Sequence, residues 1–267
     1  EILDEEEEVE PNEEHPTTFS NGDIEFHNVS FSYTSDNPLL SSFNLFIPAG
    51  KTTAFVGATG SGKTTIINLI GRFYEINSGK ITINGIDLSQ LNRSEINKHI
   101  GFVLQDVFLF SDTIHNNITL GNQAISREQV IQAAKKIGAH DFIMKIPQDY
   151  DHVIGERGGV LSVGQRQLLA FIRAMVYEPM ILILDEATSS IDSESEILIQ
   201  KAIAEVTKNR TSIIIAHRLS TIQQADQIHV MEKGQIIQTG SHASLLSVEG
   251  AYKTLFEKQF NELDEKV

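Results

Sequence analysis

Hydrophobic and polar positions alternate along residues 24–33, with one interruption at Asn28. This period of two predicts a strand or a bulged hairpin. A second short strand is expected at 43–47, and it ends at the Pro-Ala-Gly turn formed by residues 48–50. Residues 80–87 predict another strand followed by a turn. The N-terminal part of the chain should therefore contain antiparallel strands.

Short runs at 53–56, 180–184 and 212–216 are almost wholly apolar. Strands that are covered on both faces have this composition, so the last two runs are expected to be central strands of a parallel sheet. Residues 112–145 are rich in helical patterns, and residues 194–207 predict the helix that connects the two central strands. The pattern indicates an α/β fold.

A polar residue predicts the start of each of two helices. Ser126, with Gln129 three positions later, forms a capping-box pattern. A longer helix should begin near Ser162 and run to about residue 174. A hydroxyl, a glycine and free N–H groups at this start make an anion site, because a helix N-terminus carries partial positive charge. The residues expected to bind there are Ser162, Gly164 and Gln165.

A phosphate loop of the form G-x-x-x-x-G-K-T lies between the 53–56 strand and an apolar segment that predicts a helix. Glycines let backbone N–H groups turn toward phosphate oxygens, the lysine reaches the β- and γ-phosphates, and the threonine hydroxyl binds Mg²⁺. This strand–loop–helix context argues against an accidental glycine turn. The nucleotide-binding residues expected here are Gly57, Thr59, Gly60, Ser61, Gly62, Lys63, Thr64 and Thr65.

Acidic and imidazole side chains follow two of the buried strands. Asp185 ends one strand and is expected to hold Mg²⁺, and Glu186 is placed to orient or deprotonate a water molecule. His217 directly follows another strand and could hydrogen-bond the γ-phosphate. Taken alone, adjacent carboxylates are as often solvated loop charges, and a lone histidine is more often structural.

Two further residues stand at the ends of predicted strands. The ring of Tyr33 could stack on adenine, although an ordinary sheet aromatic is the plain alternative. Gln105 could reach Mg²⁺ or the water, although it could equally be a polar residue that ends a strand.

Charge is concentrated at the N-terminus. The chain has a formal net charge of −15, and its first 14 residues contain nine Asp or Glu and no Lys or Arg, which leaves −6 for the remainder. Residues 1–21 are therefore expected to be an acidic linker. An acidic chain argues against non-specific binding to nucleic acid. The absence of cysteine excludes disulfides and thiolate chemistry, and no long apolar run predicts a membrane span.

Taken together, these motifs resemble the nucleotide-binding domain of ABC transporters over about residues 22–260. The aromatic residue, Walker A, Q-loop, signature, Walker B, catalytic glutamate, D-loop and switch histidine occur in the family's order, at Tyr33, 57–64, Gln105, 161–165, 181–185, Glu186, 189–192 and His217. The resemblance implies a P-loop NTPase fold with a parallel central sheet, an N-terminal antiparallel β subdomain and an inserted helical subdomain at about 106–175. It also implies ATP and Mg²⁺ as ligands, with Thr64, Gln105 and Asp185 at the metal.

Finer features resemble the exporter subtype. Residues 155–159 look like the exporter X-loop, residues 2–6 like the segment that leaves a last transmembrane helix, and residues 231–242 like the family's closing strands. We therefore expect a membrane part outside this chain, a position at the cytoplasmic face of a membrane, and a short tail at 261–267.

By analogy, two such domains form a head-to-tail dimer, homomeric or heteromeric. ATP on Walker A of one domain is covered by Ser162, Gly164 and Gln165 of the other, and Glu186, His217 and Gln105 promote hydrolysis. Val163 stands where the family usually has glycine. It is either a tolerated variant in a homodimer or the mark of a heterodimer with one degenerate site.

Other functions stay open at this point. An importer-type or non-transport ABC ATPase would carry the same motifs. A nucleotide-gated regulatory module that binds ATP without turnover is a second alternative, although an intact Glu186 and His217 argue against it.

Overall fold

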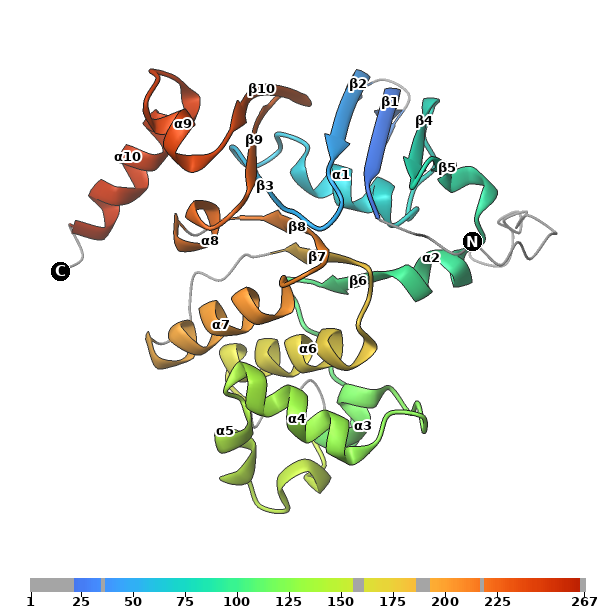
Figure 1. Ribbon diagram of the computed structural model, residues 1–267, viewed down its shortest axis with the longest axis vertical. Coiled ribbons are helices and arrows are strands. Elements are labelled where there is room, and N and C mark those ends of the chain that lie inside the picture. The colour runs from blue at the N-terminus through green and yellow to red at the C-terminus, as the bar shows by residue number, and fades with distance from the viewer. Residues whose placement is uncertain (1–21, 35–36, 156–160, 186–192, 217–218, 265–267) are drawn as a thin grey trace.

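The computed structural model describes residues 22–34, 37–155, 161–185, 193–216 and 219–264. Calls that fall on Glu186, on 189–192, on 156–159 or on His217 lie outside these ranges. Two β-sheets and a group of helices are stacked along the long axis of the molecule (Figure 1).

A four-stranded antiparallel sheet has the order β2-β1-β4-β5. Its strands are β1 (Ile24–Ser32), β2 (Pro38–Ile47), β4 (Ser78–Ile83) and β5 (Ile86–Asp87). Asn28 has a positive φ of 49° and lies at the shift of register between β1 and its neighbours, so the irregularity predicted there is confirmed. The second strand starts earlier than predicted, because Pro38 pairs with Ser32.

The second sheet has six strands in the order β10-β9-β3-β8-β7-β6, all parallel except the β9–β10 hairpin. The strands are β3 (Thr52–Val56), β6 (Ile100–Val103), β7 (Ile181–Asp185), β8 (Thr211–Ile215), β9 (Gln227–Glu232) and β10 (Gln235–Gly240). The two apolar runs expected to be central strands are β7 and β8, and both have neighbours on each side. The prediction of a parallel central sheet is confirmed.

Both faces of this sheet are covered. In β7, Leu182 and Leu184 belong to the apolar core shared with the helices, whereas Ile181 and Ile183 belong to the core shared with the antiparallel sheet and α1. Each side chain buried in this way stabilises the fold by about 1.5–3 kcal/mol relative to an exposed one. Alternate side chains of β7 therefore join the core under the helices to the core under the antiparallel sheet.

The helices lie in two groups. α1 (Lys63–Ile70) lies between the two sheets, and α6 (Val163–Tyr177) and α7 (Ser193–Val206) cover the opposite face of the parallel sheet (Figure 1). α3, α4 and α5 form a layer beyond α6 (Figure 1). The bounds of the remaining helices are α2 (Arg93–His99), α3 (Ile114–Thr119), α4 (Arg127–Ile137), α5 (His140–Met144), α8 (Leu219–Gln223), α9 (His242–Leu246) and α10 (Ala251–Asp264).

The capping box predicted at Ser126 is present: its hydroxyl accepts from the N–H of Gln129, and the Gln129 side chain accepts from the N–H of Ser126. No helix within the described ranges is long and apolar enough to cross a membrane.

Candidate functional site

A cavity of about 470 Å³ lies where the two sheets meet. A volume in this range is typical of small-molecule sites. The cavity brings together residues that are up to 152 positions apart, and nine of its ten lining residues were singled out by the sequence. The lining consists of Tyr33, Leu39, Thr59, Gly60, Gly62, Lys63, Thr64, Thr65, Gln105 and Asp185.

The phosphate loop depends on glycine at positions of positive φ. Gly57 has φ 147°, and a Cβ there would lie 2.2 Å from the backbone oxygen of Met231. Gly62 is the N-cap of α1 with φ 105° and makes no side-chain cap, so the first N–H groups of the helix have no side-chain acceptor at their N-cap. These groups and the helix dipole form an anion site at this end of α1.

Lys63 lies inside the loop that it follows. Its Nζ donates to the carbonyl oxygens of Gly57 at 2.8 Å and Ala58 at 3.0 Å, and the side chain is buried. Burial lowers the pKa of Lys63, and the nearby Asp185 carboxylate acts in the opposite direction. The ammonium group therefore stands at the centre of the loop, within the cavity. Thr64 is exposed beside it.

Tyr33 is 46% exposed and is fixed at the rim of the cavity. Its hydroxyl lies 3.1 Å from Oγ1 of Thr65, and its ring packs edge-to-face against Phe31 and Tyr74, with centroids 4.8 and 4.9 Å away. Sequence reasoning missed Tyr74, which is 47% exposed, because no strand pattern surrounds it. It also missed the hydrogen bond between Tyr33 and Thr65, which lies on α1, the helix that follows the phosphate loop.

Gln105 and Asp185 meet because of the sheet topology. β6 and β7 are parallel neighbours, with Val103 paired to Leu184, so the residues that follow them emerge at the same edge. Both line the cavity, because ligand sites of open parallel sheets lie at the carboxyl ends of the strands.

The predicted second anion site is at the start of α6. Ser162 is the N-cap and forms a capping box: the N–H of Gln165 donates to Oγ of Ser162 at 3.2 Å, and the N–H of Ser162 donates to Oε1 of Gln165 at 3.0 Å. The Ser-x-x-Gln spacing would have predicted this box, as it did at Ser126. Ser162 and Val163 are exposed, and Gly164 is buried.

Within one chain, the two anion sites are separate. Neither Ser162, Gly164 nor Gln165 is among the described residues that line the phosphate-loop cavity. The structure thus brings together Tyr33, the phosphate loop, Gln105 and Asp185, but it does not bring the start of α6 to them.

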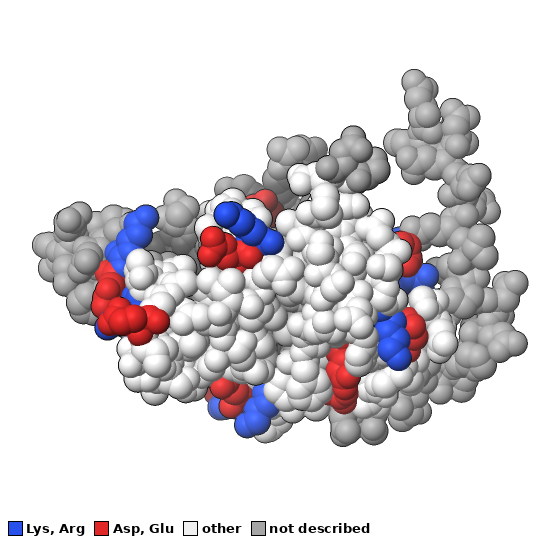
Figure 2. Space-filling model, turned by 90° about the horizontal axis from the view of Figure 1, so that it is seen from above, with Lys and Arg blue, Asp and Glu red and all other residues white. Residues whose placement is uncertain are grey.

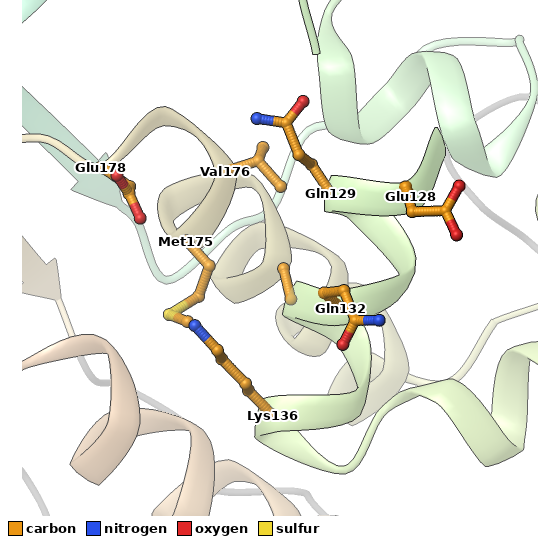
Figure 3. Close-up of a pocket in the computed structure, with 8 residues that line it drawn as sticks. Glu128, Gln129, Gln132, Lys136, Met175, Val176 and Glu178 are labelled. Atoms are coloured by element: carbon orange, nitrogen blue, oxygen red, sulfur yellow. The ribbon is translucent and has the colours of Figure 1, made fainter. Parts of the chain in front are cut away.

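A second cavity of about 280 Å³ opens between α4 and α6 (Figure 3). Its side chains include two carboxylates, two amides and one ammonium group, and Figure 3 shows Lys136 reaching along the surface toward Met175. Opposite charges on two helix flanks do not make the positive cradle that a triphosphate needs. The phosphate-loop cavity is therefore the candidate nucleotide site.

On the face seen from above, charged residues are scattered in small groups of mixed sign with wide uncharged areas between them (Figure 2). The described part of this face shows no extended basic field.

A phosphate loop between β3 and α1, at the carboxyl edge of a parallel sheet, defines a P-loop NTPase. The family model described as ABC transporter matches residues 40–189. The chain belongs to this family, whose ATP-binding domains hydrolyse ATP.

Similar proteins agree with this placement. The chain is 48% identical to an uncharacterized ABC transporter ATP-binding protein of Bacillus subtilis, over 97% of the chain and 43% of the relative. It is 48% identical to an ATP-dependent lipid A-core flippase of Syntrophus aciditrophicus, over 90% of the chain and 40% of the relative. It is also 48% identical to a putative multidrug export ATP-binding/permease protein of Staphylococcus aureus, over 91% and 42%.

A solved structure gives the same result. A bacterial Atm1-family ABC exporter with ATP bound superimposes with a TM-score of 0.84 and 40% identity, over 91% of this chain and 42% of that one. The chain therefore spans about two fifths of the length of the relatives it matches.

Proposed function

We propose that this chain is the ATP-hydrolysing motor domain of an exporter. The observation that carries the proposal is the single cavity in which Tyr33, Lys63, Thr64, Gln105 and Asp185 converge on the glycine loop. Exporter names among the relatives support the transport part of the proposal.

The lining residues divide into groups with different tasks. Thr59, Gly60 and Gly62 offer the loop's N–H groups to the β-phosphate, and Lys63 holds the β- and γ-phosphates. Tyr33 stacks on the adenine, and its bond to Thr65 keeps the ring at a fixed distance from the loop. Gly57 permits the turn that makes this approach possible.

Oxygen donors for Mg²⁺ line the same cavity, at Thr64, Gln105 and Asp185. Among the described residues no group of three His, Cys, Asp or Glu forms a metal site. That agrees with Mg²⁺, which proteins hold through one or two carboxylates together with substrate phosphates. When bound, Mg²⁺ would neutralise charge on the phosphate oxygens.

For the chemical step we assign the base to Glu186, the residue after Asp185, and the orienting hydrogen bond to His217. A water oxygen attacks the γ-phosphorus and transfers a proton to Glu186, the bond to the β–γ bridging oxygen breaks, and ADP and phosphate result. Gln105 is placed to sense the γ-phosphate.

The lid over the cavity comes from a second domain. Ser162, Gly164 and Gln165 stand at an exposed helix start, and this chain has no phosphate cavity beside them within its described residues. A head-to-tail dimer would place each start of α6 over the partner's loop. Val163, 42% exposed, would face the same nucleotide.

A membrane part of the same polypeptide is the second partner. Four large apolar side chains near Gln105 are 47–66% exposed and are here called the aromatic patch. They are Leu104, Phe108, Phe110 and Val153. The rings of Phe108 and Phe110 lie 5.0 Å apart, and Val153 pairs with Thr113, three residues after Phe110. Exposed apolar patches mark interaction sites. This one adjoins Gln105, so docking there would place the chain at the cytoplasmic face of the membrane and link transport to the nucleotide.

Phosphate release by the wild type and by Glu186→Gln tests the enzymatic part. The proposal expects hydrolysis by the wild type at high concentration, and ATP binding without hydrolysis by the variant. ATP binding without wild-type hydrolysis, even in the full polypeptide, would favour a regulatory module. The transport part depends on the complete reading frame: about six apolar spans joined to this chain support an exporter, and their absence supports an importer-type or non-transport ATPase.

A further inference from the structure

The start of α6 and the aromatic patch are joined by hydrogen bonds that the proposed catalytic steps do not use. We propose that Asn117 and Arg173 are positioning residues that make these two surfaces move together. The inference rests on the proposed function, because it assigns one surface to the partner's nucleotide and the other to the membrane part.

Asn117, on α3, holds the backbone of the loop that carries the patch. Its Oδ1 accepts from the N–H of Phe110 at 2.7 Å, and its Nδ2 donates to the carbonyl oxygens of Phe110, Asp112 and Thr113 at 3.0–3.2 Å. The side chain is 1% exposed. A buried amide with four bonds to one loop fixes that loop, because each unmade bond would leave a desolvated polar group.

Arg173, on α6, binds the backbone carbonyl of Asn117. Its Nε and one terminal nitrogen donate to the carbonyl oxygen of Asn117 at 3.1 and 2.8 Å. One turn further, the hydroxyl of Tyr177 donates to the carbonyl oxygen of Thr119 at 2.7 Å. Both carbonyls lie at the C-terminal end of α3. The Thr119 carbonyl also accepts from the N–H of Asn122, and α6 adds the side-chain donors at this end of the short helix.

The geometry makes α6 a rigid connection. Eleven residues of helix separate Ser162 from Arg173, which is about 16 Å at 1.5 Å per residue. α6 is packed against α3, and also against α4, as Figure 3 shows for the flank with Met175 and Val176. A shift of Ser162 toward a partner therefore moves Arg173, and through Asn117 it moves the loop at Phe110.

Hydrogen exchange on the chain itself tests the connection without hydrolysis. Arg173→Lys keeps the charge but cannot make the paired bonds. We expect the Phe110 amide, which Arg173 does not contact, to exchange about 3- to 30-fold faster. The control is Gln132→Ala, on α4 in the same helical layer (Figure 3), which should leave the exchange rate of the Phe110 amide unchanged. Unchanged exchange in Arg173→Lys would overturn the inference.

A second measurement separates positioning from a merely structural role. We expect Asn117→Ala to lower the ATPase rate of the full polypeptide about 3- to 30-fold while the isolated chain stays within about twofold. Arg173→Lys, which leaves the buried amide in place, serves in the same two assays if the alanine variant does not fold. Asn116→Ala, on the exposed neighbour that bonds the Asp112 side chain, is the matched control.

Equal losses in both contexts, or no loss in either, would contradict the inference. Failure of the proposed function looks different: the wild type itself would then hydrolyse no ATP, while the exchange experiment would still report the connection.

Discussion

α1 and α6 begin in opposite ways, although both helix starts are assigned to a nucleotide, α1 to the one in its own chain and α6 to the one in the partner. α1 begins at Gly62, which offers no side-chain cap, and the cavity lies directly in front of it. α6 begins at Ser162, where the capping box pairs the N–H groups of Ser162 and Gln165, and both residues are outside that cavity. In the proposed dimer, one start has its site within the chain, and the other is completed by a second chain.

The difference teaches how capping and binding are related. An uncapped start leaves its first N–H groups free for another acceptor, and we assign the nucleotide's phosphates to this task at α1. A capped helix start needs no ligand to stay formed, so the first turn of α6 is stable at the surface before the proposed partner binds.

The largest effect should come from the α1 side of this comparison. Lys63→Ala removes the ammonium from the centre of the loop and should reduce ATP hydrolysis by about 100- to 1000-fold, the usual loss when one preorganised electrostatic contact is removed. Phosphate release at saturating ATP measures it. Lys80→Ala, at an exposed position of β4, is the control. A loss below tenfold would contradict the assigned role.

Gly57→Ala should weaken the same start through its backbone. The new Cβ meets the Met231 carbonyl at 2.2 Å and the residue must keep φ 147°, so we expect the free energy of unfolding to fall by about 1–3 kcal/mol and ATP binding to be lost. Gly60→Ala is the matched variant, because its Cβ meets no atom within 4 Å. Urea unfolding compares the two variants. Equal losses in their free energies of unfolding would show that the close approach to Met231 is unimportant.

Ser162→Ala tests the α6 side against a capping box of the same kind. Ser162 and Ser126 both start helices with a Ser-x-x-Gln box, so each alanine variant should reduce the free energy of unfolding by about 1 kcal/mol. Only Ser162→Ala should also slow hydrolysis, because only this helix start is assigned to the partner's nucleotide. Equal ATPase rates in the two variants would mean that α6 serves as an ordinary helix.

The smallest effect is expected at the rim. Tyr33→Phe keeps the ring but loses the bond to Thr65, so ATP affinity should fall by no more than about tenfold, or roughly 0.5–1.5 kcal/mol. Tyr33→Ala also removes the stacking surface and should bind more weakly still. Titration with a fluorescent ATP analogue compares them, and a larger loss for the phenylalanine variant would contradict a stacking role.

Local patterns predicted the fold well. The alternation in β1, its irregularity at Asn28, the apolar runs of β7 and β8, and the capping box at Ser126 were all readable, because each depends on neighbours in sequence. The motif order also predicted which residues line the cavity, although their roles in binding and catalysis stay predictions.

Contacts between distant segments were not readable. Nothing near Tyr74 marks it as the neighbour of Tyr33, and the bonds between Arg173 and Asn117 depend on how two helices pack. Glu186 and His217 lie outside the described residues, so their assignment depends on the motifs alone.

Cross-linking between two chains tests the composite site most directly. The chain contains no cysteine, so Ser162→Cys in one copy and Thr59→Cys in the other, both with Glu186→Gln, provide one thiol each. With a short bifunctional maleimide, our account predicts a cross-linked dimer that forms with ATP and Mg²⁺ and is strongly reduced without nucleotide. Equal cross-linking with and without ATP, or none under either condition, would contradict the claim that α6 of one chain completes the phosphate loop of another.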